Sequence, residues 1–150
     1  MALTNLINFT KRLTEYDFAA EQDKIIRTDQ SKDLLAQSQR KVLSEGKDKT
    51  GKVRNDEYAP LTKRLKAQYG HNSLSRVTDI VTFYDTSELY QSLYTEFSGK
   101  TFQVTSNIGL KWDKMITRIG EPNYGIDPQR IEKYKIEYLK PEVLKTIPKP

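Results

Sequence analysis

Cysteine is absent from the 150 residues of this sequence, and histidine occurs once. The absence of cysteine excludes disulfides, thiolate zinc sites and a cysteine nucleophile. The single histidine, His71, lies in a turn-like stretch between Gly70 and Asn72, where a surface role is favoured because no partner residue is marked nearby. No run of about 18 apolar residues occurs, so we expect no contact with a membrane.

The usual signatures of catalysis are missing as well. No glycine-rich phosphate-binding motif, nucleophile elbow or zinc-protease motif is present. Asp79 and Asp85 could bind a metal through their oxygens, but capping and turn formation are favoured for aspartates that flank an apolar stretch. We therefore expect no catalytic residue, no metal and no cofactor, and predict that the chain is not an enzyme.

Apolar residues are fewer than in an average domain. Hydrophobic residues make up 36% of the chain and charged residues 30%. A chain of this length buries roughly two-thirds of its unfolded surface. We predict one structural domain over 1–150 with a thin core, part of whose stability comes from other chains. The net charge of +5 permits contact with nucleic acid or acidic proteins.

The first third of the chain has helical periodicity. Leu3, Leu6 and Ile7 begin an apolar stripe with the spacing of one helix face. The pattern predicts a long helix over residues 3 to about 44, which can kink or break near Thr28, because threonine and aspartate disfavour helix interiors. We expect this helix to end at Gly46.

A basic segment follows. Two glycines and alternating charges predict an exposed loop over about 46–59, and Pro60 and Gly70 bound a short helix. The segment supplies the candidate phosphate-binding residues of an alternative function, a nucleic-acid-binding module whose affinity falls steeply with salt. These residues are Lys47, Lys49, Lys52, Arg54, Lys63, Arg64 and Lys66.

The middle of the chain predicts β-structure. Residues 78–84 indicate a short extended segment, and Asp85 or Thr86 would cap a helical turn after it. Alternating runs around Ser98-Gly99 predict an antiparallel hairpin over 93–104 with position 97 opposite 100. The predicted apolar face holds Leu93, Phe97, Phe102 and Val104, and the polar face Tyr94, Glu96, Thr101 and Gln103.

The last third predicts an amphipathic helix that begins at Asp127-Pro128 and ends or kinks at Pro141. An extended tail over about 140–150 should follow. The fold class is therefore α+β: a long N-terminal helix, a short antiparallel sheet that includes the hairpin, a C-terminal amphipathic helix and an extended tail. Four of the nine tyrosines have amphipathic spacing, which favours a half-buried core or a subunit interface over a base-stacking surface. They are Tyr90, Tyr94, Tyr134 and Tyr138.

The segment 85–93, followed at once by the hairpin, resembles tail-completion (head–tail joining) proteins of tailed bacteriophages. The family pattern is roughly D-T-G-x-L-x-x-S-[IL] before a strand, a turn and a strand, and after an N-terminal helix. Ser87 replaces the glycine, which argues against a required positive φ there. Most of 35–145 is also similar to virion proteins of phages and prophages from gut bacteria, through Gly46-Lys47-Asp48, Gly51, Tyr58-Ala59-Pro60-Leu61-Thr62, Arg76-Val77-Thr78 and Lys140-Pro141-Glu142-Val143-Leu144.

The resemblance implies a structural subunit of the virion, assembled in the bacterial host cytoplasm. Such subunits form rings of six or twelve copies in the neck or upper tail, around the DNA channel. The implied partners are copies of the chain, neighbouring portal or connector and tail proteins, and packaged DNA. The loop 46–59 and the tail are expected to order on assembly. The expected interface residues are Asp85, Thr86, Leu89, Tyr90, Tyr94, Tyr134 and Tyr138.

Overall fold

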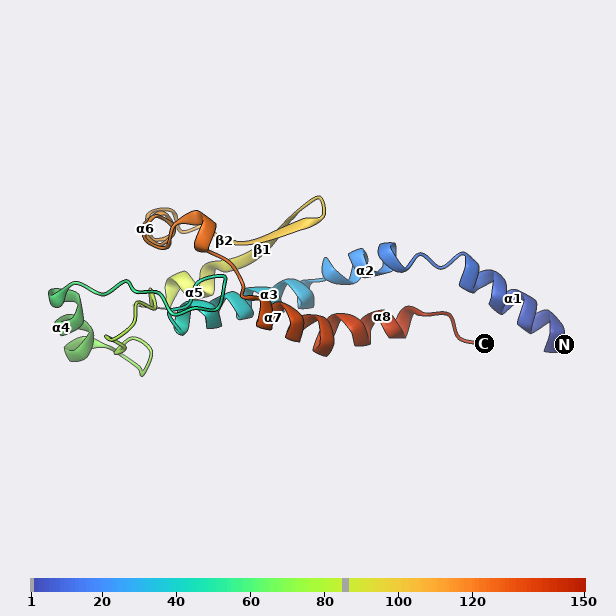
Figure 1. Cartoon of the computed structure of the whole chain (residues 1–150), viewed down its shortest axis with the longest axis horizontal. Helices are drawn as coiled ribbons and strands as arrows, with labels where there is room; N and C mark the ends of the chain where they lie inside the picture. The colour runs from blue at the N-terminus through green and yellow to red at the C-terminus, as the bar shows by residue number, and fades with distance from the viewer. Residues whose placement is uncertain (1, 85–86) are drawn as a thin grey trace.

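The computed structural model describes residues 2–84 and 87–150 and confirms the α+β class (Figure 1). Helices make up most of the described chain, and its one regular sheet is an antiparallel pair of strands. The elements, in order, are α1 (Ala2–Thr14), α2 (Phe18–Ile26), α3 (Asp29–Ser44), α4 (Pro60–Tyr69), α5 (Glu88–Ser92), β1 (Leu93–Ser98), β2 (Thr101–Ser106), α6 (Gly109–Ile119), the 3-10 turn η1 (Glu121–Asn123), α7 (Pro128–Tyr134), the π-helical turn η2 (Lys135–Leu139) and α8 (Lys140–Thr146).

The N-terminal segment consists of three helices, so the prediction of one long helix is wrong. The Asp17 carboxylate accepts a hydrogen bond from Ala20 N–H at 3.0 Å and begins α2. Thr28 accepts from Ser31 N–H at 3.3 Å and begins α3. Short polar side chains that bond to the backbone compete with a continuous helix and favour caps. One interruption falls at Thr28, where the sequence allowed a break, and the interruption before Asp17 was not predicted.

The hairpin has the predicted faces but a different register. Phe97 lies opposite Phe102, and Leu93 lies opposite Ser106, so the strands extend past residue 104 and the two-residue turn is Gly99-Lys100. Gly99 has a φ of 57°, which the first position of such a turn requires and glycine adopts without strain. The register differs from the predicted one by two residues. A shift of two leaves each side chain on its own face, so the apolar pattern could not detect it.

The core lies between α3, the hairpin, α5 and α6. Leu43 is fully buried, and the amphipathic helix α6 closes the opposite side with Met115. Arg40 of α3 donates to the carbonyls of Tyr90 at 2.6 Å and Leu93 at 3.1 Å, which fixes the start of β1 to the helix. Each fully buried aliphatic side chain stabilises the fold by about 1.5–3 kcal/mol. The core residues are Ala36, Leu43, Leu89, Tyr90, Leu93, Val104, Met115 and Ile119.

The C-terminal segment is helical as far as Thr146, so the predicted extended tail over 140–150 is wrong for 140–146. Asp127 caps α7, with Pro128 in its first turn, as predicted. The π-helical turn η2 then lets Lys140 N–H bond to the carbonyl of Lys135. A wider turn of this kind accommodates the missing N–H of Pro141 without ending the helix.

The molecule is elongated, with α1 at one end and α4 at the other (Figure 1). The core lies between them, and α2 packs beside α8. Arg12 of α1 donates to the carbonyl of Lys149 at 3.1 Å, and the hydroxyls of Tyr16 and Thr146 are 2.7 Å apart. Within the described residues, no helix is both long enough and apolar enough to span a membrane.

Candidate functional site

Two of the seven predicted phosphate-binding cations are used inside the subunit. Arg54 is almost buried, and its guanidinium donates to the carbonyls of Lys47 and Val81 while it pairs with Asp56 at 3.1 Å. Lys66 Nζ donates to the carbonyl of Tyr84 at 2.6 Å. These bonds hold the loop and α4 against 81–84, where the chain is irregular, so the predicted extended segment forms no strand.

The five remaining cations are more exposed, and two of them have carboxylate partners. Lys47 pairs with Glu45 at 2.6 Å, and Lys63 pairs with Glu57 at 2.9 Å. The other three form no salt bridge with any residue that the structure describes. They are Lys49, Lys52 and Arg64. DNA binding by the basic segment therefore stays a prediction that rests mainly on these three side chains.

The loop 46–59 is fastened to the rest of the subunit. Lys49 N–H donates to the carbonyl of Asn123 at 2.9 Å, and Arg118 reaches Asp56 at 3.2 Å. The Asp48 carboxylate accepts hydrogen bonds from the Thr50 hydroxyl at 2.6 Å and the Thr50 N–H at 2.8 Å. The hydroxyl bond in particular lowers the pKa of Asp48. We therefore revise the expectation that this loop orders only on assembly.

Most of the expected interface residues make contacts within the subunit. Leu89 and Tyr90 belong to the core, and the Tyr90 hydroxyl donates to the carbonyl of Thr82 at 2.6 Å. Tyr134 and Tyr138 fix the C-terminal helices to α3, with hydroxyl contacts of 2.5 Å to Ser31 and 3.0 Å to Thr28. Tyr94 is exposed on the hairpin. Asp85 and Thr86 lie outside the described residues.

Ser87 has the backbone conformation that the sequence argued against. Its φ is 67°, in the left-handed region, directly before α5. Glycine adopts this conformation readily, whereas other residues are strained there. The inference that the serine at this position argues against a positive φ is therefore wrong.

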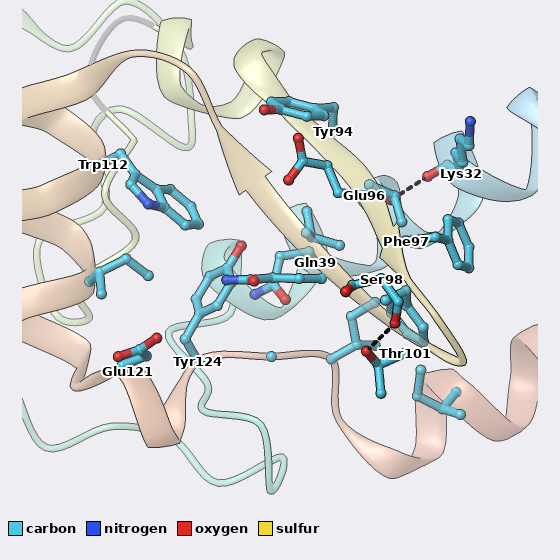
Figure 2. A pocket seen from close by; sticks show the side chains of 18 of the residues that line it. Lys32, Gln39, Tyr94, Glu96, Phe97, Ser98, Thr101, Trp112, Glu121 and Tyr124 are labelled. Atoms are coloured by element: carbon cyan, nitrogen blue, oxygen red, sulfur yellow. Dashed lines mark hydrogen bonds between the residues drawn. The ribbon is translucent and has the colours of Figure 1, made fainter. Parts of the chain in front are cut away.

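A cleft of about 1160 Å³ lies between the hairpin, α3, α6 and the segment after α6 (Figure 2). The sequence did not predict this cleft. Apolar side chains from β2 and α6, among them Phe102, Val104, Trp112 and Ile116, form part of its lining. Trp112 packs edge-on against Tyr124, with ring centroids 5.2 Å apart. The cleft is thus lined by both apolar and polar side chains, from elements far apart in the sequence.

The cleft contains polar groups that are buried and unsatisfied. Gln39 of α3 is 1% exposed, and neither its amide oxygen nor its amide nitrogen has a hydrogen-bond partner among the described residues. The Tyr124 hydroxyl also lacks such a partner, and burial raises its pKa. Both side chains line the cleft (Figure 2). A buried polar group without a partner costs about 1–3 kcal/mol, and because these atoms are closed to solvent, a ligand can bond to them only if the side chains turn.

Two carboxylates line the same cleft. Glu96 of β1 and Glu121 of η1 form no salt bridge with the described residues, and Figure 2 shows both at its sides. The two cations that line the cleft have carboxylate partners: Arg27 pairs with Asp23 at 2.8 Å and Lys32 with Asp29 at 3.8 Å. The unpaired charges of the cleft are therefore negative. In the described parts of the chain, no group of three or more histidine, cysteine, aspartate or glutamate side chains could hold a metal ion.

One signal in the sequence points to this cleft. Gln39 lies on the same helical stripe as Leu35, Val42 and Leu43, which are all buried. A polar residue within an apolar stripe marks a position where a buried hydrogen-bonding group must find a partner.

No family model, no curated protein and no solved structure matches this chain.

Proposed function

We propose that this protein is a structural, non-catalytic subunit of a tailed-phage virion. In this proposal, copies form a ring of six or twelve in the neck or upper tail, between the portal and the tail. The ring joins head to tail around the channel through which packaged DNA passes. The function is positional: the subunit's surface contacts, and not a reaction, make the joint.

The observation that carries the proposal is the conformation of Ser87. The family pattern has glycine at this position, and glycine favours a left-handed backbone. Ser87 adopts that backbone with a φ of 67°, and a helical turn and an antiparallel hairpin follow directly in α5, β1 and β2. Helices precede the motif, as in the family pattern. The local geometry thus supports a resemblance that otherwise rests on short sequence motifs.

The surface of the subunit supports assembly. Four large apolar side chains of α1 are exposed, and the cleft holds polar groups without partners. An isolated subunit that exposes an apolar stripe gains free energy when another chain covers it. These are the features that a subunit built for assembly requires.

Deletion of the gene from the phage that carries it tests the proposal. We expect electron micrographs of the lysate to show filled heads and separate tails, because the joint is missing. A plasmid copy of the gene should restore joined particles. Joined, infectious particles in the absence of the protein would contradict the proposal, as would a loss of heads or of DNA packaging alone.

A further inference from the structure

We propose that α1 of one copy docks into the cleft between the hairpin and α6 of the next copy. The inference rests on the proposed ring, to which it adds the contact that joins neighbouring subunits. Four observations support this contact: the uncovered helix, the size and lining of the cleft, the matching polar and charged groups, and the position of α1 in its own subunit.

The first observation is the uncovered apolar face of α1. Leu3, Leu6 and Ile7 are 71%, 58% and 60% exposed, and Leu13 continues the same face at 41%. Their spacing places all four on one side of the helix. Helices of a folded protein normally bury such a stripe against another element, so α1 has the surface of a helix whose partner is elsewhere.

The second observation is the size and lining of the cleft. Its volume of about 1160 Å³ exceeds the roughly 300–1,000 Å³ of a typical small-molecule pocket. Phe102 of β2 and Trp112 of α6 present apolar surface to it. An amphipathic helix that lays its apolar face into a groove of this kind is a common mode of peptide recognition.

The third observation is the chemical complementarity between α1 and the cleft. Thr10 lies in the middle of the apolar face of α1, and its hydroxyl donates to the carbonyl of Leu6 at 2.8 Å. Its oxygen can still accept a hydrogen bond. The Gln39 amide nitrogen and the Tyr124 hydroxyl lack an acceptor, but both atoms are closed to solvent in the free subunit, so their side chains must turn for the docked helix to reach them.

Charge also matches between the helix and the cleft. The charged residues of α1 are Lys11 and Arg12. Lys11 pairs only with the exposed Glu15, at 3.9 Å, whereas Glu96 and Glu121 of the cleft form no salt bridge with the described residues. Complementary charges of this kind fix the orientation of a docked segment more than they add affinity.

The fourth observation is the position of α1 in its own molecule. The helix lies at the far end of the elongated subunit, beyond the C-terminal segment, and the elements that line the cleft, α3, the hairpin and α6, lie away from it (Figure 1). Bonds from Arg12 and Tyr16 to the C-terminal segment hold it there. A helix and a cleft on different faces of one subunit form a heterologous contact, which closes into a ring when the rotation between copies permits.

Cross-linking in the naturally cysteine-free chain tests the proposal. One full-length chain carries Ile7→Cys in α1, and a second, differently tagged chain carries Phe102→Cys in the cleft. The control partner carries Leu61→Cys, an exposed residue of α4 at the other end of the molecule. With a short bis-maleimide reagent, we expect the Ile7–Phe102 pair to form a mixed dimer at least about tenfold faster than the Ile7–Leu61 pair, because docking raises the local concentration.

The possible outcomes distinguish a wrong docking contact from a wrong ring proposal. Equal rates for the two pairs in protein that has assembled would overturn the docking while the ring proposal stands. Protein that stays monomeric at its highest soluble concentration would contradict both. Cross-linking within a single chain that carries both cysteines, in dilute monomer, would show that α1 enters its own cleft and would also overturn the docking. As a second readout, Leu6→Asp should abolish assembly, and Asn8→Asp on the opposite face of α1 should leave it intact.

Discussion

At the scale of single residues, two side chains are held in backbone conformations that favour glycine. Phe83 has a φ of 56° and Ser87 a φ of 67°. Phe83 N–H donates to the Tyr58 hydroxyl at 3.1 Å, and the Arg54 guanidinium lies 5.0 Å from the centre of the Phe83 ring. Interactions of this kind hold a residue in a conformation that it would not adopt alone. Phe83 lies just before the motif that resembles tail-completion proteins, and Ser87 lies within it.

Replacement of Ser87 by glycine should stabilise the subunit by up to about 1 kcal/mol, because it relieves the left-handed strain. Part of this gain is offset by the larger backbone entropy of glycine in the unfolded chain. Urea denaturation followed by circular dichroism measures the change in the free energy of unfolding. Ser98→Gly, at an exposed strand end without a positive φ, is the control and should destabilise by about 0.5–1 kcal/mol. Equal effects of the two substitutions would contradict the role of φ.

Gln39 provides a second prediction at this scale. Its amide is buried without a partner, so Gln39→Met should stabilise the free subunit by about 1–3 kcal/mol, since the side chain keeps its size and loses its unsatisfied atoms. The same variant should assemble less well, because the docked helix would lose a hydrogen bond. Thermal unfolding of the monomer and the mass of the assembly measure the two effects.

Gln37→Met, on the exposed side of the same helix, is the matched control and should change the free energy of unfolding by less than about 0.5 kcal/mol. A destabilised Gln39→Met monomer would show that the amide is satisfied in the free subunit.

At the scale of elements, one charge cluster ties together the end of α3, the basic loop and the start of α7. Arg130 pairs with both Asp127 and Glu45. Asp127 is 1% exposed, and its carboxylate also caps α7 through Arg130 N–H at 3.1 Å. Burial alone would raise the pKa of Asp127, but the hydrogen bonds from Arg130 outweigh it and hold the pKa below its usual value. Hydrogen bonds from Lys47 and Arg130 lower the pKa of Glu45 in the same way.

Because of this cluster, the free energy of unfolding should depend on pH. Carboxylates whose pKa is lower in the folded state stabilise it above their unfolded pKa of about 4, and this contribution is lost as the pH falls through the folded value. Arg130→Met should destabilise the subunit by about 3 kcal/mol at pH 7, since it leaves Asp127 buried without its partner. Denaturation at pH 7 and at about pH 3 measures this difference, which should shrink at the lower pH. A difference that does not change with pH would contradict the account.

The sequence predicted those elements whose signals are local. Pro60 and Gly70 bound α4, and Asp127 starts α7, because caps and prolines act within one turn of helix. The helix across Pro141 was missed, because a π-helical turn compensates for the absent N–H. The cleft was missed for a different reason: Gln39, Val104 and Tyr124 are far apart in the sequence, and their neighbours become visible only in the folded chain.

At the scale of the whole molecule, apolar surface is exposed at both ends. α1 carries its uncovered stripe at one end, and α4 exposes Leu61, Leu65 and Tyr69 at the other (Figure 1). The core between them is small, as the composition predicted. A subunit with this distribution of apolar surface gains more from contacts between copies than from its own interior.

The mass of the native, full-length protein across a range of concentrations tests the central claim most directly. Native mass spectrometry should detect a closed species of six or twelve copies, because a heterologous contact adds subunits until the ring closes. Intermediate species should be scarce once the ring has formed. A single chain at every concentration would contradict the claim that this protein's function is to assemble.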